Sequence, residues 1–287
     1  MKTAIITDSN SGISEQEAGR LGIYVVPMPV IINNTILFEN KNILAEQFFD
    51  SIKRGDRVTT SQPSLADIMQ MWENLLDEYE ELVYIPMSSG LSSSCMTAKG
   101  IANEYDGRVY VADNHRISVT LKQSVLYAKR LADKDVRGSE IVSALEREAY
   151  DSSIYLAVDS LEHLQRGGRI SPAVRMIGTA LNIKPVLAIY GNRLEPYANV
   201  RGSHMKCLTK MTCALKNSVN KLMDYQPEKM VYIGLAGAGI EDSVRDECMK
   251  IIQYEFPRAV TYYDPLPLSI CAHTGPGAIG IGMSVGE

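Results

Sequence analysis

Apolar positions along the chain follow two periods, and their alternation predicts a protein of mixed strands and helices. Short apolar runs are expected to form buried strands, whereas longer segments with apolar residues every three or four positions are expected to form helices. In the first half, the predicted strands are 4–7, 82–86 and 109–112, and the predicted helices are 66–79, 93–103 and 119–132. Strands that alternate with helices in this way favour a parallel sheet covered on both faces.

A hairpin and a second unit complete the predicted architecture. Residues 24–32 and 35–39, joined at Asn33-Asn34, predict an antiparallel hairpin appended to the parallel sheet. After a polar helix that ends near Tyr150, the pattern predicts strands 155–158, 185–190, 194–200, 230–235, 259–263 and 277–283, and helices 203–225 and 240–255. Strands 185–190 and 194–200 are expected to pair through a turn at Gly191-Asn192. We therefore expect an α/β protein with two domains, 1–150 and 151–287.

Charge and cysteine usage narrow the function classes. The chain has 287 residues and a formal net charge of −5, and its Lys and Arg residues are scattered, which argues against nucleic acid as the partner. The five cysteines are far apart and form no C-x-x-C, so neither a disulfide framework nor a metal site is indicated. Without an export signal or a long apolar stretch, the chain is expected to be cytoplasmic.

Three segments concentrate hydroxyls, glycines and prolines where strands are predicted to end. They are 59–64, 86–94 and 273–277. Ligands of open α/β sheets bind at such ends. Ser92 to Ser94 would lie at a helix N-terminus, where free N–H groups and the helix dipole favour an anion. Thr60, Ser61 and His273 are candidates to contact the same anion.

Each of these segments also has a local interpretation. Ser92 could be a helix cap, Pro63 and Ser64 could start a helix, and His273 could be structural. Asp8 and Ser9 could contact a ligand or cap a helix at 13–21. The run 165–171 carries two arginines on a glycine turn before a helix, which suits an acidic protein surface or a solvated loop equally.

Common enzyme motifs are missing or incomplete. Gly90-Leu-Ser-Ser-Ser94 lacks the last glycine of the G-x-S-x-G elbow, and no H-E-x-x-H or Walker A motif is present. Gly234-Leu-Ala-Gly-Ala-Gly239 departs from G-x-G-x-x-G, and we interpret it as a tight strand-to-helix turn.

Six motifs, in order and over nearly the whole chain, resemble the DegV family, which includes the fatty-acid-binding (FakB) subunits of bacterial fatty acid kinase. The motifs are Thr7-Asp-Ser9, Thr60-Ser-Gln-Pro-Ser64, Ser88-Ser-Gly-Leu-Ser92, Arg166-Gly-Gly-Arg-Ile-Ser171, Leu181-Asn-Ile-Lys-Pro185 and His273-Thr-Gly-Pro-Gly277. The resemblance implies a two-lobed DegV-like fold. Its N-terminal domain would have three layers around a parallel sheet, its C-terminal α/β domain a mixed sheet, and the interlobe region a ligand tunnel.

The resemblance also implies a function and residue roles. The chain would be a non-catalytic carrier without a cofactor, which holds one long-chain fatty acid and presents its carboxylate to a separate ATP-using kinase. The residues implied to bind the carboxylate are Thr60, Ser61, Ser92, Ser93, His273 and Thr274, and those implied to face the kinase are Arg166, Arg169 and Arg201. The family's Leu-Ser-Gly-Thr reads Leu91-Ser-Ser-Ser94 here, so Ser93 alters the backbone approach to the ligand.

Further expectations concern the tail and the alternatives. Methionines, among them Met28, Met87 and Met176, would help a tunnel fit different tails. Transient membrane contact is expected for a protein that exchanges lipid. Two alternatives stay open at this point: a hydrolase or transferase acting on an acyl or phosphoryl group with Ser92 as nucleophile and His273 as base, and a carrier for another apolar acid.

Overall fold

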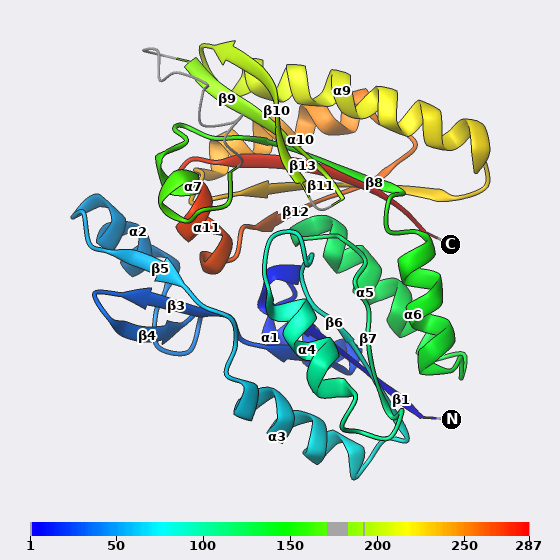
Figure 1. The fold of residues 1–287 in the computed structure, drawn as a ribbon. Helices are drawn as coiled ribbons and strands as arrows, with labels where there is room; N and C mark the ends of the chain where they lie inside the picture. Colours follow the sequence, from blue (N-terminus) through cyan, green and yellow to red (C-terminus); the bar gives the residue numbers. More distant parts are fainter. Residues whose placement is uncertain (1, 171–182, 192, 287) are drawn as a thin grey trace.

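A computed structural model of the chain describes residues 2–170, 183–191 and 193–286, and within these ranges it contains three β-sheets with helices packed against them (Figure 1). Some sequence predictions lie outside the described residues. These are Ser171, Met176, Leu181, Asn182, Asn192 and the helix expected after Gly168.

The first sheet is parallel throughout. Its strands are β1 (Thr3–Asp8), β2 (Ile23–Val26), β6 (Glu81–Ile85) and β7 (Val109–Val111), in the order β2-β1-β6-β7. Alternate residues of β1 and β6 are buried on opposite faces, which is why both faces carry helices. One face packs on α3 (Leu65–Leu76) and α4 (Ser94–Ala102), and the other on α1 (Glu15–Leu21), α5 (Ser118–Ala132) and α6 (Gly138–Arg147).

A small antiparallel sheet holds the predicted hairpin. Its strands are β3 (Pro29–Ile32), β4 (Thr35–Phe38) and β5 (Val58–Thr60), in the order β4-β3-β5, and α2 (Ala45–Lys53) packs beside it. The turn at Asn33 and Asn34 is confirmed, with left-handed φ values of 47° and 69°.

Two details of the hairpin prediction are wrong. Residues 24–32 do not form one strand, because β2 pairs with β1 whereas β3 pairs with β4 and β5. The break falls at Pro27, which has no N–H to donate to a ladder. The hairpin is therefore not appended to the parallel sheet but belongs to a sheet of its own.

The second half of the chain forms a mixed sheet, as expected. Its strands are β8 (Ser152–Ala157), β9 (Ile183–Tyr190), β10 (Arg193–Arg201), β11 (Met230–Gly237), β12 (Val260–Pro265) and β13 (Ile279–Gly286). The order is β10-β9-β8-β13-β11-β12, and only β11 and β12 are parallel among the described pairs. The division into domains 1–150 and 151–287 stays a prediction.

Helices cover both faces of the mixed sheet. The outer face packs on α9 (His204–Tyr225) and α10 (Asp242–Glu255) (Figure 1). Ser203 precedes α9 at the predicted N-cap position, although its side chain makes no capping bond. The inner face packs on α7 (Glu162–Arg166), α11 (Leu268–Thr274), the small sheet and the first turn of α5.

Helix α5 joins the parallel sheet to the mixed sheet. Val119 packs on two strand glycines, since a Cβ at Gly234 would lie 2.5 Å from Val119 Cβ and one at Gly282 would lie 2.9 Å from its Cγ2. The Tyr262 hydroxyl donates to the Val119 carbonyl at 2.7 Å. The buried Lys122 ammonium pairs with Glu17 at 2.9 Å and with Asp264 at 3.0 Å. The two sheets are thereby held at a fixed distance.

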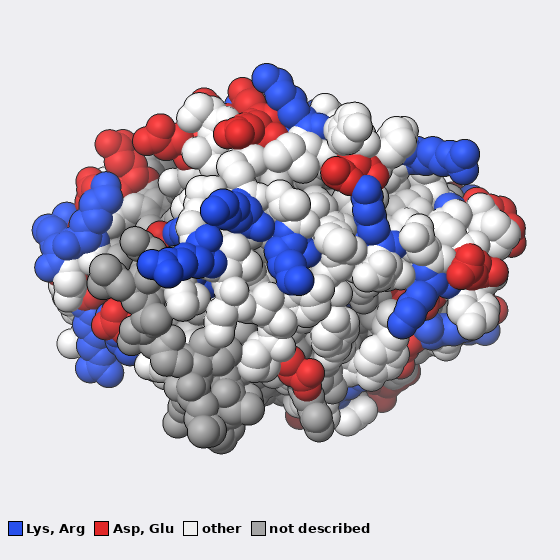
Figure 2. All heavy atoms as spheres, turned by 90° about the horizontal axis from the view of Figure 1, so that it is seen from above, with Lys and Arg blue, Asp and Glu red and all other residues white. Residues whose placement is uncertain are grey.

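The exterior shows no membrane-spanning element in the described part of the chain, where no helix is both long and apolar enough to cross a bilayer. Figure 2 views the molecule from the side of α9 in Figure 1. Lys and Arg side chains occupy several separate places on this face, and Asp and Glu side chains lie between them.

We predict that Gly282→Ala destabilises the protein by about 1–3 kcal/mol, because the added methyl group overpacks the contact between α5 and β13. Its Cβ would lie 2.9 Å from Val119 and 3.0 Å from Thr120. Gly280→Ala is the matched control on the same strand, since its Cβ finds its nearest neighbours at 3.7 Å. Urea unfolding measures both variants. Equal denaturation midpoints for the two would contradict the proposed constraint.

Candidate functional site

An apolar cavity lies between the parallel sheet and the mixed sheet. The cavity and its open mouth together leave about 1010 Å³ free of protein atoms. Met28 and Met87 line it, as predicted. The other apolar lining residues are Leu91, Ile117, Val119, Ile154, Leu156, Leu164, Ile189, Leu194, Ala236, Leu266 and Ile270.

Polar residues from six separate segments of the described chain line the same cavity. All six predicted carboxylate-binding residues are among them: Thr60, Ser61, Ser92, Ser93, His273 and Thr274. Gln62, Arg169, Asn10, Ser118 and Ser269 also line it. The structure thus brings the predicted residues together around one space, whereas their role toward a ligand stays a prediction.

Thr60 and His273 come from different elements and meet directly. Thr60 is the last residue of β5, and its Oγ1 lies 2.8 Å from His273 Nε2. His273 was expected in a turn at a strand end, but it lies in the last turn of α11. The N-terminus of α11 is held by Glu39, whose carboxylate accepts the Leu268 N–H at 2.9 Å. Burial raises the pKa of the Glu39 carboxyl, and this hydrogen bond partly opposes the rise.

The imidazole of His273 is neutral at physiological pH. Burial lowers its pKa to about 4, and the charges of Arg169 and His163 contribute to the decrease. Its Nδ1 is buried against Gly167 and has no hydrogen-bond partner among the described residues. A buried lone pair is tolerated better than a buried N–H, so the proton belongs on Nε2. Nε2–H then donates to Thr60 Oγ1, and the Thr60 hydroxyl proton remains available for a ligand.

The serine segment reaches the cavity through the loop that follows β6. Ser92 Oγ accepts the Ser94 N–H at 3.2 Å and donates to Ser94 Oγ at 3.0 Å, so its oxygen takes part in starting α4. Ser93 is the residue at the N-cap position, but its side chain makes no capping bond. Instead, its Oγ lies 3.5 Å from Gln62 Oε1, which also accepts Thr97 Oγ1 at 3.2 Å.

Gln62 therefore joins the segment of Thr60 to the segment of Ser92, and sequence reasoning did not identify it. Its position inside the Thr60-Ser-Gln-Pro-Ser64 motif was the available signal. The interpretation of Ser64 as a helix cap is confirmed, since its Oγ accepts the Asp67 N–H at 3.4 Å. Ser61, which is exposed, donates its hydroxyl to the Gln62 carbonyl at 3.1 Å.

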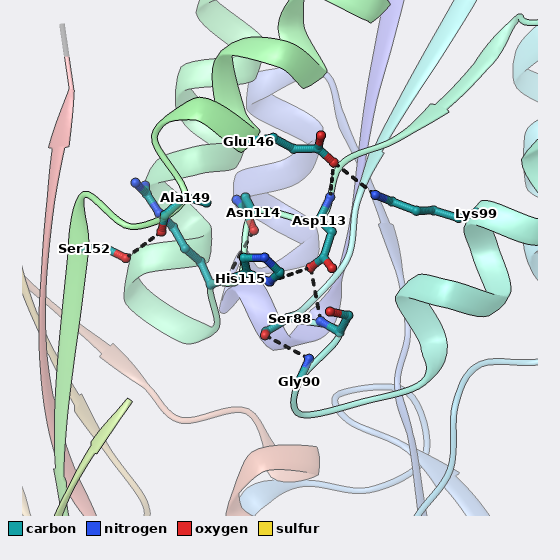
Figure 3. A network of polar contacts seen from close by, with 11 residues as sticks. Ser88, Gly90, Lys99, Asp113, Asn114, His115, Glu146, Ala149 and Ser152 are labelled. Atoms are coloured by element: carbon teal, nitrogen blue, oxygen red, sulfur yellow. Dashed lines mark hydrogen bonds and ion pairs between the residues drawn. The ribbon is translucent and has the colours of Figure 1, made fainter. Parts of the chain in front are cut away.

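A charged network holds the start of the serine loop (Figure 3). Asp113 Oδ1 accepts the Ser89 N–H at 3.2 Å and lies 3.2 Å from His115 Nδ1. The Asp113 N–H donates to Glu146 Oε1 at 3.1 Å, and the same oxygen pairs with Lys99 of α4 at 3.0 Å. The loop between β6 and α4 is thus fixed at Ser89 by Asp113, and the helix that follows the loop is fixed at Lys99 by Glu146.

Asp8, at the end of β1, supports the cavity wall and does not cap α1. Its fully buried carboxylate accepts the N–H groups of Asn10 and Met87, both at 2.9 Å, and burial raises its pKa to about 6. Asp8 caps the short 3-10 helix η1 (Ser9–Ser11), whereas Ser14 caps α1. The prediction that Asp8 or Ser9 caps α1 is therefore wrong; Ser9 Oγ accepts the Met28 N–H at 3.0 Å.

The three predicted kinase-facing arginines lie in different places. Arg169 lines the cavity and also two surface hollows that adjoin its polar end, one past Ser89 to Ser93 and one past Thr60 and His273. Arg166 lines the second of these hollows. Arg201 is exposed at the end of β10 and lines none of the three. No cluster of His, Cys, Asp and Glu suited to a metal occurs in the ranges that the structure describes.

A parallel and a mixed sheet with an apolar cavity between them that is polar at one end are typical of proteins that bind small molecules. The family model described as "Uncharacterised protein, DegV family" matches residues 2–285. The chain therefore belongs to the DegV family, as the sequence motifs indicated.

Relatives match over their whole length. A DegV domain-containing protein of Staphylococcus aureus strain N315 is 30% identical over 283 residues, covering 98% of both chains, and one of Deinococcus radiodurans is 29% identical over 291 residues, covering 99% of this chain and 98% of the other. A solved DegV family protein of Thermus thermophilus, described as fatty acid binding, is 29% identical with a TM-score of 0.86 over 99% of each chain. The DegV structure of Bacillus subtilis, 24% identical with a TM-score of 0.85 and 99% coverage of each chain, shares the fold.

We predict that Gly167→Ala displaces the His273 ring, because the added Cβ would lie 2.1 Å from Nδ1. The ring would lose its contact with Thr60 and gain solvent, so the pKa of His273 should rise from about 4 toward the ordinary histidine value. A proton NMR titration of the imidazole measures this. Gly168→Ala is the control: its Cβ has no neighbour within 4 Å, so it strains only its own left-handed backbone. A His273 pKa that stays near that of the parent in Gly167→Ala would contradict the packing argument.

Proposed function

We propose that this protein is a carrier that holds one long-chain fatty acid, with the tail in the cavity and the carboxylate at its polar end, and presents the carboxylate to a separate kinase. The observation that carries the proposal is the cavity itself: its walls are apolar over most of their extent and end at hydroxyls from separate segments. An amphipathic acid with one charged end and a long apolar tail matches this distribution.

The tail supplies most of the affinity in this proposal. Each buried CH₂ contributes roughly 0.8 kcal/mol, so a 16-carbon chain gains on the order of 12 kcal/mol before the costs of binding. Branched aliphatic and methionine side chains from both sheets would line a tunnel for the chain. The flexible thioethers of Met28 and Met87 allow this wall to adapt to tails of different shape.

The head group is oriented by neutral donors. Thr60 keeps a hydroxyl proton for the carboxylate because His273 Nε2–H occupies one lone pair of its oxygen. Ser92 and Thr274 line the same cavity, and among the described residues the Thr274 hydroxyl makes one long contact, to the Gly275 carbonyl at 3.4 Å. Hydrogen bonds to a charged group contribute about 1.5–3 kcal/mol each but largely offset desolvation, so they fix position more than affinity.

The comparisons support the ligand class. The Thermus thermophilus protein, whose description is fatty acid binding, shares 29% of its sequence and the whole fold with this chain. We carry that ligand class over to this chain as part of the proposal. A carrier for another apolar acid would use the same cavity, and the identity of the extracted ligand separates the two.

Presentation to a kinase requires a carboxylate that a partner can reach. The polar end of the cavity adjoins two surface hollows, and Arg169 lies at their junction. Arg166 beside it and the more distant Arg201 are proposed to contact the partner enzyme. Cytoplasmic location and transient membrane contact, through which the acid would enter and leave, belong to the same proposal.

A hydrolase is favoured less by the geometry. A serine nucleophile needs a base within hydrogen-bond reach. Ser92 Oγ donates to Ser94, and His273 Nε2 is engaged by Thr60, so the described residues contain no contact between Ser92 and His273. We therefore assign no catalytic residue to this chain.

Native mass spectrometry of the purified protein tests the ligand. We expect one co-purifying acid per chain with a mass in the range of C14–C20 fatty acids, released by solvent extraction, because an apolar cavity that buries the tail retains such a ligand. The Gly282→Ala variant, which crowds the cavity wall at Val119, should retain less. Recovery of a protein that neither carries nor takes up any long-chain acid would refute the proposal.

We predict that Ser92→Ala and Thr60→Val weaken acid binding only modestly, by about three- to tenfold, and reduce acyl-phosphate formation with a fatty acid kinase far more. The tail would still bind, but the carboxylate would lose its orientation. Calorimetric titration gives the affinity and a coupled kinase assay gives the transfer rate. Ser139→Ala, on the exposed face of α6, is the control for both assays. Transfer at the parent rate in both cavity variants would refute the orienting role.

A further inference from the structure

Three buried polar side chains line the cavity in addition to the six predicted carboxylate-binding residues. They are Asn10, Ser118 and Ser269, with exposed fractions of 1%, 8% and 6%. Buried polar groups normally have full hydrogen-bond partners, so their satisfaction decides whether this cluster is complete without a ligand.

The cluster is incomplete within the described part of the chain. Ser269 Oγ donates to Asn10 Oδ1 at 2.7 Å, which satisfies the amide oxygen. The Asn10 amide nitrogen has the Met87 sulfur at 3.0 Å, and the Asn10 side chain also donates to the buried Asp8 carboxylate, so its donors are occupied. The Ser118 hydroxyl makes no hydrogen bond with any residue that the structure describes, although it borders the cavity.

Ser118 is also held in a costly backbone conformation. Its φ is +54°, in the left-handed region that few residues other than glycine adopt, and it is the first residue of α5. Strain of this kind persists where the surrounding structure fixes it, and it is frequent at ligand sites. The neighbouring contact of Val119 with Gly234 and Gly282 fixes Ser118 at the cavity wall.

The helix register places the cluster relative to the carboxylate site. Ser269 and His273 are four residues apart on α11 and therefore lie on one face, about 5–6 Å apart between Cβ atoms. Ile270 and Thr274 are also four residues apart and lie beside the first pair on α11. All four residues line the cavity. A ligand whose carboxylate lies near His273 thus passes Ser269, and the Asn10 bonded to it, within a few carbons of its charged end. Ser118 lines the same cavity.

We propose that this cluster binds a hydroxyl group on the acyl chain, so that the acid suited to this protein is a long-chain fatty acid hydroxylated near its carboxyl end. The inference rests on the proposed function. The ligand hydroxyl accepts from the Ser118 hydroxyl or donates to Ser269 Oγ. A plain methylene chain leaves the Ser118 hydroxyl against hydrocarbon, which is unfavourable.

Calorimetric titration of the delipidated protein with four acids tests the proposal. The probes are palmitic acid, its 3-hydroxy and 5-hydroxy derivatives, and 16-hydroxypalmitic acid, whose hydroxyl lies at the far end of the tail. For the parent and for Ser118→Gly, the preference is the Kd of palmitic acid divided by that of each hydroxylated acid. Glycine adopts the left-handed conformation without strain, so Ser118→Gly removes the hydroxyl and keeps the fold. Ser139→Ala is the surface control.

We expect the preference for at least one of the two carboxyl-proximal isomers to be about three- to tenfold larger in the parent than in Ser118→Gly, as for one neutral hydrogen bond. The preference for the 16-hydroxy acid should be the same in both proteins. If Ser118→Gly leaves the preference for both carboxyl-proximal isomers unchanged, the inference is overturned. The carrier function would remain intact, since the cluster would then hold only water. Failure of all four acids to bind would instead overturn the proposed function itself.

Extraction of the native ligand gives a second, independent readout. If the inference holds, the acid recovered from the freshly purified protein is one oxygen heavier than a plain saturated or unsaturated acid, and fragmentation places that oxygen near the carboxyl end. Exclusive recovery of unoxygenated acids from cells that also contain hydroxylated ones would contradict it.

Discussion

The close contact between α5 and the mixed sheet is the constraint on which the cavity depends. Val119 can approach β11 and β13 as it does only because residues 234 and 282 are glycines. This contact determines the distance between the parallel sheet, which α5 also covers, and the mixed sheet. Tyr262 and the buried pair of Lys122 with Asp264 reinforce it from β12. A cavity can persist between two sheets only where such contacts prevent them from closing on it, since protein interiors otherwise pack to high density.

The same principle of close contact extends to the polar end of the cavity. Gly167 makes room for the His273 ring, and Gly275, with a φ of +78°, makes room for the ring of His163. These two contacts join α7 to α11, while Glu39 fixes the N-terminus of α11 from the small sheet. His273 therefore reaches Thr60 with little freedom to move. The glycines of the Arg166-Gly-Gly-Arg and His273-Thr-Gly-Pro-Gly motifs thus have a structural explanation that their spacing alone did not provide.

The sequence predicted those features that depend on local pattern. The strands of the mixed sheet, those of the parallel sheet other than β2, the Asn33-Asn34 turn and the hydroxyl-rich segments follow from periodicity and turn chemistry, and the family resemblance added which of those segments converge. It did not predict α11 around His273, because seven residues between prolines and glycines carry little helical signal, and the helix depends on Glu39 from a distant strand. Nor did it identify Asn10, Ser118 or Ser269 as cavity residues. In the sequence each is an ordinary polar residue of a loop or helix, and only the packing of the two sheets places them at the cavity. The separation of β2 from β3 had a local signal in Pro27, which the apolar run concealed.

The chemistry of the polar end suits a carboxylate that is held but kept reactive. A guanidinium that paired bidentately with the carboxylate would engage both oxygens and reduce their ability to attack a phosphoryl group. A hydroxyl donor such as Thr60 occupies one lone pair and leaves the others free. Because His273 is neutral, it directs the Thr60 proton without placing a full charge against the ligand. Arg169 lies at the mouth, where the cavity and the two surface hollows meet, so its charge faces the side from which a phosphoryl donor would approach. In the proposed carrier, binding and presentation would therefore be separated in space: the apolar wall would retain the tail, and the neutral donors would leave the carboxylate oxygens available to a partner.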